Sequence, residues 1–233
     1  MKYENMVKGK FVARPNRFIA EIIIGEERVR AHVKNTGRCR ELLVPGAEVY
    51  LEDFDGRMGT RKMRYSLIAV VKAGNIFNID SQAPNKICEE GLLSGHIRIP
   101  GMDRITLVQR EKTFGDSRLD FYVEDVCGRK GWIEVKGVTL EEDGVARFPD
   151  APTERGLKHV NELRHARAQG FCACILFILQ MEAMKIMEPN DETHRAFGDA
   201  LRLAAAENVG VVAYDCVVTP DQITVNKKVP VRL

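Results

Sequence analysis

The chain has 233 residues, of which 45% are hydrophobic and 29% charged, and it carries a formal net charge of +2 at pH 7. This composition is ordinary for a soluble globular protein, and the length allows one large or two small domains. The longest apolar run, residues 171–179, is far too short to cross a membrane, which argues against a membrane-spanning protein.

Two further features bear on location and partners. The six cysteines form no Cys-x-x-Cys pair, so buried thiols are expected rather than disulfides or zinc ligands, and residues 1–10 are too polar for a signal peptide. Both features predict a cytoplasmic protein. Residues 1–80 carry 15 Lys and Arg against 10 Asp and Glu, whereas the remainder carries 20 against 23. The positive excess suits contact with a phosphate backbone, although an ordinary basic surface would give the same count.

Residues 7–80 contain a series of predicted strands separated by turn signals. The turns are Asn35-Thr36-Gly37 and Pro45-Gly46, and residues 38–43 suit a short helical turn. Short strands with one small helix favour an OB-like barrel, a fold that often binds oligonucleotides. The expected strands are 7–13, 18–24, 28–33, 47–52, 65–72 and 76–79.

OB-like barrels usually combine a positively charged groove with exposed aromatic side chains. Phe11, Phe18 or Tyr65 would be the aromatic platform here, although core packing is the more usual role for such residues. The groove would be built from Arg14, Arg17, Arg30, Lys34, Arg38, Arg40, Arg61, Lys62 and Arg64.

After a short join at residues 80–84, the pattern predicts a second domain over residues 81–233. A short helix begins after Pro84, and the apolar run at 172–179 suits a strand buried on both faces. The expected helices are 85–94, 156–169 and 193–207, and the expected strands outside the central hairpin are 105–110, 172–179, 211–218 and 223–231.

The central hairpin of this domain, residues 118–138, gathers three charged side chains. Side chains alternate along each strand, so Glu134 and Lys136 share a face and pairing places Asp120 beside them. Two carboxylates suit a divalent cation, which polarises a phosphoryl oxygen and acidifies bound water. The ammonium can orient that water or stabilise developing charge. The alternative is a solvated strand face with cross-strand ion pairs.

The predicted helix at 156–169 follows the hairpin. Its first turns and the residues just before them hold Thr153, Arg155, Lys158 and His159, near the expected site. Basic groups beside a helix N-terminus favour phosphate, because the backbone N–H groups and the helix dipole attract anions. An ordinary charged surface helix is the alternative.

An aspartate on one strand followed by Glu-x-Lys on the next resembles the PD-(D/E)xK nuclease superfamily. The predicted order of helix, three strands, helix, strand, helix and strand matches its core. Longer segments resemble the sugar fermentation stimulation protein A (SfsA) family over nearly the whole chain. These are NTGRCRELLVPGAEVYL (35–51), SQAPNKICEEGLLSGHI (81–97), SRLDF (117–121), EVKGVTL (134–140) and FPDAPTERGLKHVNELRHARAQG (148–170).

This resemblance implies an OB-like β-barrel over residues 1–80 and a nuclease-like α/β domain with a central mixed sheet over 81–233. Asp120 and Glu134 would hold Mg²⁺ or Mn²⁺, Lys136 would orient water, and Glu90 would assist from the preceding helix unless it is simply exposed. Nucleic-acid contacts would come from Arg38, Arg40, Arg118, Arg155, Lys158 and His159. Leu119 stands where the superfamily name has proline, a departure that many members share.

Three functions follow from these observations. The first is metal-dependent cleavage of phosphodiester bonds. The second is non-specific DNA binding by a regulator of sugar (maltose) metabolism, as the family resemblance implies, with the nuclease fold only as a scaffold. No helix-turn-helix or other base-reading motif is evident in the sequence. Sugar binding, the third, has no residue pattern behind it, and the oligomeric state is not predicted.

Overall fold

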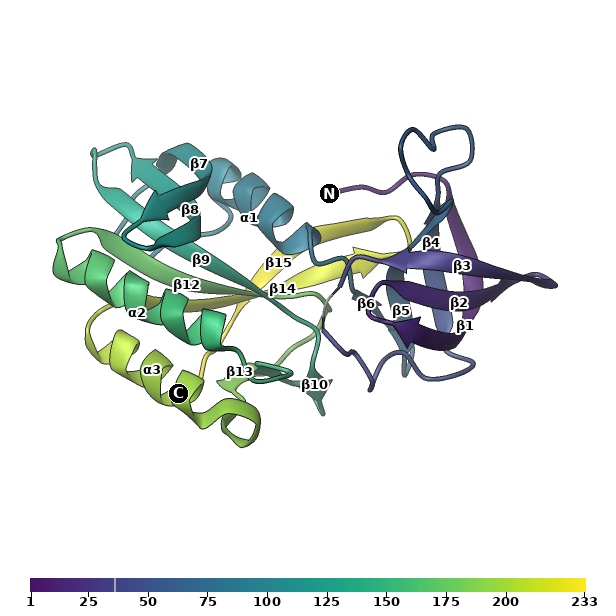
Figure 1. Cartoon of the computed structure of the whole chain (residues 1–233). Helices are drawn as coiled ribbons and strands as arrows, with labels where there is room; N and C mark the ends of the chain where they lie inside the picture. The colour runs from purple at the N-terminus through teal and green to yellow at the C-terminus, as the bar shows by residue number, and fades with distance from the viewer. Residues whose placement is uncertain (36) are drawn as a thin grey trace.

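A β-barrel and an α/β unit make up the computed structural model, which describes residues 1–35 and 37–233 (Figure 1). The first sheet has the strand order β3-β2-β1-β4-β5-β6, and an additional parallel pairing of β3 with β5 closes a five-stranded barrel. The expected OB-like barrel is therefore confirmed. Its strands are β1 (Met6–Asn16), β2 (Ile19–Ile24), β3 (Glu27–Val33), β4 (Glu48–Asp53), β5 (Tyr65–Lys72) and β6 (Asn75–Asn78).

Close contact between β1 and β2 shows how the sequence allows the barrel to close. Register shifts in the β1–β2 pairing on both sides of Ala13 let the long first strand bend. At Gly9 a Cβ atom would lie 2.6 Å from the Ile22 side chain, so only glycine fits there. Alternate side chains such as Ile22 and Leu51 point inward and are fully buried, and they form the barrel core.

The second unit is built on a six-stranded mixed sheet of order β15-β14-β12-β9-β8-β7. The central strands β9, β12 and β14 are parallel and the outer pairings are antiparallel, so the sheet is mixed, as expected. Its helices and sheet strands are α1 (Ala83–Ser94), β7 (Ile105–Phe114), β8 (Ser117–Asp125), β9 (Lys130–Val138), α2 (Glu154–Ala168), β12 (Cys172–Leu179), α3 (Asp191–Ala206), β14 (Gly210–Thr219) and β15 (Gln222–Val229). No helix in residues 1–35 or 37–233 has the length and apolarity needed to cross a bilayer.

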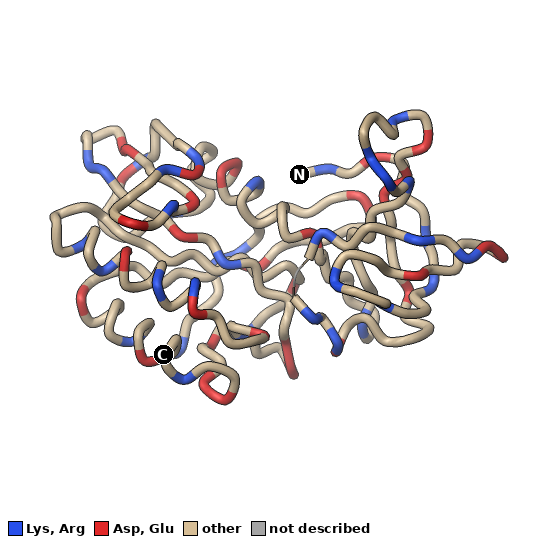
Figure 2. The backbone as a smooth tube through the Cα atoms, in the orientation of Figure 1, with Lys and Arg blue, Asp and Glu red and all other residues tan. Residues whose placement is uncertain are grey.

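Helices cover both faces of this sheet (Figure 1). Along β12, Ile175 and Phe177 point to the core that contains α2 and α3, whereas Leu176 and Ile178 point to the core that contains α1. Every β12 residue from Ala173 onward is buried, which explains its continuous apolar sequence. Charged residues of both signs are spread over both units (Figure 2).

The lone tryptophan, Trp132, lies at the start of β9 in an aromatic cluster. Its ring centroid is 5.1 Å from that of Phe114 and 5.0 Å from that of Tyr122, and Phe171 lies at 6.4 Å. The side chain is 7% exposed. This cluster packs the ends of β7, β8 and β9 against the loop that leads into β12.

A small three-stranded sheet was not predicted from the sequence. It consists of β10 (Glu141–Glu142), β11 (Val145–Phe148) and β13 (Ile186–Pro189), in the order β10-β11-β13. The turn Asp143-Gly144 has positive φ at both residues, which suits a two-residue hairpin. The β11–β13 pairing joins segments about 40 residues apart, so local patterns give no sign of it.

The first residues of the chain contact the α/β unit rather than the barrel alone. The Met1 amino group donates to the Ile223 carbonyl at 2.9 Å, and the Tyr3 N–H donates to the Asp221 carbonyl at 2.8 Å. Lys2 forms an isolated bridge with Gln222. A domain boundary at residue 80 therefore assigns to the barrel an N-terminal segment that lies along β15 of the α/β unit.

Candidate active site

Asp120 and Glu134 lie beside each other where β8 separates from β9. The paired register ends at Phe121 and Ile133, so the next residue on each strand is one of the two carboxylates. Asp120 Oδ2 accepts the Val135 N–H at 2.8 Å, and thereby replaces the missing backbone acceptor. Its Oδ1 accepts the side-chain N–H of Asn85, at the start of α1, at 2.8 Å. Alternation along the two strands correctly predicted this arrangement.

The two oxygens of the Glu134 carboxylate have different surroundings. Lys136 Nζ and His159 Nδ1 each donate to Oε1 at 2.5 Å. Oε2 is buried and has no hydrogen-bond partner among the described residues. Glu134 is 3% exposed and His159 5%, so this pair lies inside the molecule, between β9 and α2. A buried carboxylate oxygen without a partner is costly, and a cation would satisfy it.

The two carboxyl groups ionise differently. Burial raises the pKa of Asp120, and the nearby Glu134 charge raises it further. The hydrogen bonds from the Val135 N–H and the Asn85 side chain lower this pKa, but they do not outweigh the other two effects. Burial also acts to raise the pKa of Glu134, but the His159 hydrogen bond and the Lys136 ammonium outweigh it, and the pKa is lowered. Glu134 is thus the more readily ionised carboxylate, and a divalent cation would relieve its repulsion with Asp120.

The donor set fits a hard divalent cation. Two carboxylates are available, and no group of three or more His, Cys, Asp or Glu suited to a metal occurs within residues 1–35 and 37–233. Mg²⁺ commonly takes one or two carboxylates and completes its shell with water and substrate phosphate. The site therefore suits a cation that is shared with a phosphate ligand better than a closed structural metal site.

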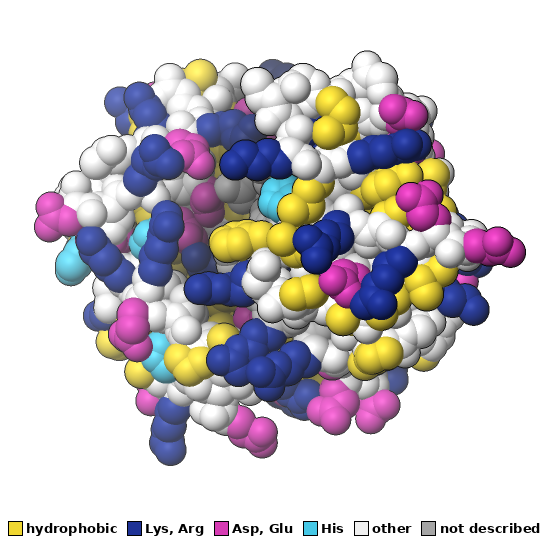
Figure 3. All heavy atoms as spheres, turned by 45° about the vertical axis from the view of Figure 1, so that its right-hand side comes forward, with side chains coloured by type: hydrophobic (Ala, Val, Ile, Leu, Met, Phe, Trp, Pro, Cys, Tyr) yellow, Lys and Arg dark blue, Asp and Glu magenta, His cyan; other side chains and the backbone are white. Residues whose placement is uncertain are grey.

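The carboxylates open into a cavity of about 440 Å³ that both units line. Asn35, Gly37 and Ser81 come from the barrel side, and Arg155 comes from the first turn of α2. Arg155 is exposed and has no acidic partner among the described residues. On the face shown in Figure 3, Lys and Arg side chains lie around a hollow that contains acidic side chains. The composite lining makes the relative position of the two units important for the site.

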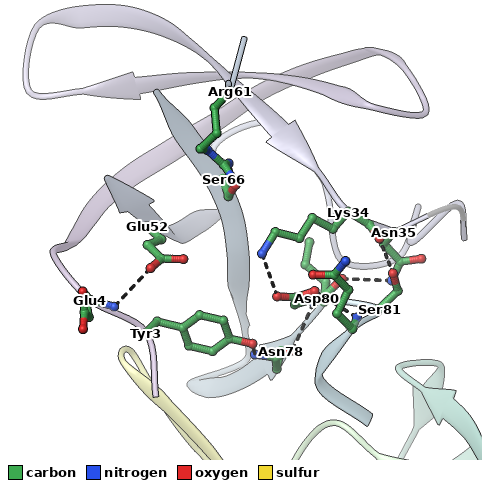
Figure 4. Close-up of polar contacts among 12 residues, drawn as sticks. Tyr3, Glu4, Lys34, Asn35, Glu52, Arg61, Ser66, Asn78, Asp80 and Ser81 are labelled. Atoms are coloured by element: carbon green, nitrogen blue, oxygen red, sulfur yellow. Dashed lines mark hydrogen bonds and ion pairs between the residues drawn. The ribbon is translucent and has the colours of Figure 1, made fainter. Parts of the chain in front are cut away.

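A buried polar network fixes that position, and Figure 4 shows its barrel side. Asp80 is fully buried and pairs with Lys34 Nζ at 3.1 Å. Asn78 accepts the Gln180 side-chain N–H at 3.0 Å and donates to the Tyr3 hydroxyl at 3.0 Å. Gln180, which follows β12, also donates to the Asp80 carbonyl at 3.1 Å. These bonds join the barrel end to the sheet directly beneath the cavity.

Glu90 does not belong to this site. It is an exposed residue of α1, its carboxylate pairs with the Met1 amino group at 3.1 Å, and it does not line the cavity. The helix residue that reaches Asp120 is Asn85, which sequence reasoning did not select. Its position directly after Pro84, in the first helical turn, was the available signal.

Three residues that we expected to contact nucleic acid have other partners. Arg118 pairs with Glu111 on β7, and Lys158 Nζ donates to the Asp116 carbonyl at 2.9 Å. His159 is buried against Glu134 and is therefore closed to a phosphate group. Neither Arg118 nor Lys158 lines the cavity. Of the expected helix contacts, only Arg155 faces it.

Arg38 and Arg40 line a second cavity of about 890 Å³ on the barrel, which also includes Gly37. Arg14, expected in the groove, instead binds backbone: its guanidinium donates to the carbonyls of Arg17, Asn35, Gly37 and Arg38 at 2.6–2.8 Å. It holds the β3–β4 loop against β1.

The three candidate aromatic residues of the barrel differ in exposure. Phe11 is a core residue, 3% exposed, and Tyr65 is partly buried beside Arg64. Phe18, at the tip of the β1–β2 hairpin, is 54% exposed. Phe18 is thus the one candidate with a free ring face.

Comparison with known proteins adds to this geometry. Residues 82–222 match the model described as the sugar fermentation stimulation protein RE domain, and residues 12–79 match that of the SfsA N-terminal OB domain. The chain belongs to the sugar fermentation stimulation protein (SfsA) family. Its resemblance to that family is thereby confirmed over both units.

Individual SfsA relatives match from end to end. The sugar fermentation stimulation protein homologues of Desulfitobacterium hafniense (strain DSM 10664 / DCB-2) and Clostridium beijerinckii are 48% and 47% identical, cover 100% of this chain, and are themselves covered over 99% and 100%. The structure of Pyrococcus furiosus SfsA in complex with Ca²⁺ matches with a TM-score of 0.88 and 27% identity, over 100% of this chain and 98% of that one.

Proposed function

We propose that this SfsA-family protein binds DNA and cleaves phosphodiester bonds with the help of Mg²⁺ or Mn²⁺. The observation that carries the proposal is the Glu134 carboxylate, whose buried Oε2 has no partner among the described residues. Glu134 lines one cavity together with Asp120 and Arg155. The Ca²⁺ complex of P. furiosus SfsA supports a divalent site in this fold. Ca²⁺ and Mg²⁺ share a preference for oxygen ligands.

Each residue of the site has a role in this proposal. Asp120 and Glu134 would hold the ion, which supplies polarisation of a phosphoryl oxygen and acidification of a bound water. Asn85 and the Val135 N–H orient Asp120, and His159 orients Glu134. Lys136, whose side chain is 14% exposed, stabilises negative charge that develops on the phosphate. Arg155 contacts a phosphate of the bound strand.

A DNA-binding regulator that keeps the nuclease fold as a scaffold is the second candidate. It is favoured by the ion pair of Lys136 with Glu134 at 2.5 Å, which neutralises the carboxylate without a metal. In this case DNA would be held mainly through phosphate contacts, without sequence preference, and affinity would fall steeply with salt. A cytoplasmic role in sugar metabolism, as the family name suggests, is compatible with both candidates.

A cleavage assay separates the two candidates. Plasmid and single-stranded DNA are incubated with the protein in the presence of Mn²⁺, Mg²⁺ or EDTA. Wild-type protein is expected to cleave only with metal, and Glu134→Gln and Lys136→Ala are expected to lose at least about 100-fold in rate. Lys112→Ala, an exposed lysine on β7 outside the cavity, is the matched control and should retain activity. Cleavage that persists in both site variants would contradict the proposal. DNA that is retarded but uncut, equally in all proteins, would support the scaffold.

A further inference from the structure

The second cavity differs chemically from the carboxylate site because its floor is apolar. Its lining includes Phe11 and Val12 of β1, Leu43 and Pro45 of the β3–β4 connection, and Ala151 of the loop before α2. A volume of about 890 Å³ leaves room for flat ring systems rather than for a single ion. Apolar surface together with planar arginine side chains can bind the faces of nucleobases, which a duplex keeps stacked inside.

The rim of this cavity carries positively charged arginine side chains. Arg17, Arg38 and Arg40 have no carboxylate within 4.0 Å among the described residues. Three other barrel arginines are paired: Arg28 with Glu21, Arg57 with Glu4 and Arg64 with Asp53. Free arginines around an apolar floor suit a ligand with anionic groups joined to flat apolar rings.

The two cavities meet at Gly37, which lines both. Asp150 lines the first cavity, and its neighbour Ala151 lines the second. A Cβ atom on residue 37 would lie 2.8 Å from Asp150 Oδ2 and 2.9 Å from Asn35 Oδ1. Glycine at this position therefore lets the Asp150 and Asn35 side chains pack against the backbone where the two cavities meet.

We propose that the second cavity holds unpaired bases of a DNA strand whose backbone crosses Gly37 into the carboxylate site. The inference rests on the proposed function and names its substrate: DNA with a single-stranded segment rather than intact duplex. Arg38 and Arg40 bind the phosphates that flank the seated bases, and the apolar floor binds their faces. Phe18, next to Arg17 at the hairpin tip, is exposed and would offer a further ring face to the strand.

Fluorescence anisotropy in EDTA tests the proposal without cleavage. The probes are a labelled oligothymidylate and a labelled blunt duplex of two complementary strands with the same total number of nucleotides. The single strand is expected to bind at least about 10-fold more tightly. Arg38→Ala combined with Arg40→Ala should weaken binding of the oligothymidylate by about 10-fold or more, whereas Arg28→Ala, an exposed arginine on β3, should leave it unchanged.

A second variant separates base contacts from general charge. Ala151→Trp fills the cavity from the α/β side without altering charge, and it should abolish the preference for the single strand while weak duplex binding persists. Equal affinity of the wild type for both probes, or full preference in Ala151→Trp, would overturn the proposal. Because binding is measured without metal and can be repeated in Lys136→Ala, these outcomes are independent of whether the protein cleaves DNA.

Discussion

Asp120 is held in the folded chain at an energetic cost that depends on pH. Its pKa is raised by burial and by Glu134, so the ionised form is less favourable in the folded state than in the unfolded state. Because the pKa of Asp120 is higher in the folded state, the protonated carboxyl contributes fully to stability below the pKa of the unfolded chain, near 4. This contribution is lost as the pH rises through the pKa of the folded state. Charge at Asp120 therefore destabilises the metal-free protein at neutral and higher pH.

Asp120→Asn is expected to stabilise the metal-free protein at pH 8. Asparagine removes the charge and can still accept the Val135 N–H, and the gain should shrink toward pH 4 as the wild-type carboxyl takes up its proton. Urea unfolding in EDTA at the two pH values measures this, with Asp116→Asn, an exposed residue of the β7–β8 turn, as the control. A gain that is equal at both pH values would contradict the assignment of the effect to ionisation.

The residues of the site differed in how well the sequence predicted them. Asp120, Glu134 and Lys136 were found because strand alternation has a period of two and fixes which side chains share a face. Glu90 was wrong because helical phase could not be set without the packing of α1. It lies five residues after Asn85, about 140° around the helix, and so points away from Asp120. His159 was placed near the site correctly, but its burial depends on how α2 packs against β9.

The start of α2 links secondary structure to the site. The Thr153 side chain accepts the Gly156 N–H at 3.0 Å and caps the helix. Arg155, two residues after the cap, lines the cavity, and His159, six residues after it, is hydrogen-bonded to Glu134. The sequence predicted the helix but placed its start at residue 156, because no Glu or Gln occupies the position three residues after Thr153 to complete a capping box.

Thr153→Ala is expected to lower the free energy of unfolding by about 1 kcal/mol, since it leaves the Gly156 N–H without its acceptor. Thr153→Ser keeps a hydroxyl in place and should lose much less. Urea unfolding of the three proteins measures the difference. If alanine and serine destabilise equally, the loss comes from the threonine methyl group rather than from the cap.

The other elements show where local patterns suffice. The barrel strands and β12 were predicted closely because strong alternation or a continuous apolar run marks them. The β10-β11-β13 sheet was missed because its strands have two to four residues each and depend on a pairing between distant segments. Of these strands, β11 contributes Arg147 and Phe148 to the cavity lining, so part of the site wall was not predicted.

At the scale of the whole molecule, the junction around Asp80 makes the barrel and the α/β unit interdependent. Lys34 of the barrel pairs with Asp80, and Asn78 is hydrogen-bonded to Gln180 of the α/β unit and to Tyr3 of the N-terminal segment. The sequence predicted only a short join here, because a buried network becomes visible only once both units are folded. The composite cavity depends on this network for the position of Asn35 and Ser81.

Asp80→Ala is expected to cost about 3–5 kcal/mol, because Lys34 then lies largely buried without its partner. Lys34→Ala combined with Asp80→Ala should be less damaging than Asp80→Ala alone, and Asp55→Ala, at an exposed barrel turn, should be nearly neutral. Thermal unfolding followed by circular dichroism measures all three. A double variant as unstable as Asp80→Ala would mean that the unpaired lysine is not the source of the loss.

The aromatic cluster around Trp132 gives the protein a built-in optical probe. Since this is the single tryptophan and lies in β9, two residues from Glu134, its emission reports the α/β unit and not the barrel. Its buried indole should emit at short wavelength and shift to the red when the sheet opens. When the junction is intact, this shift should coincide with the loss of circular dichroism. If the change in Trp132 emission and the loss of circular dichroism occur at different times, the difference would show when one unit unfolds relative to the other, without any added label.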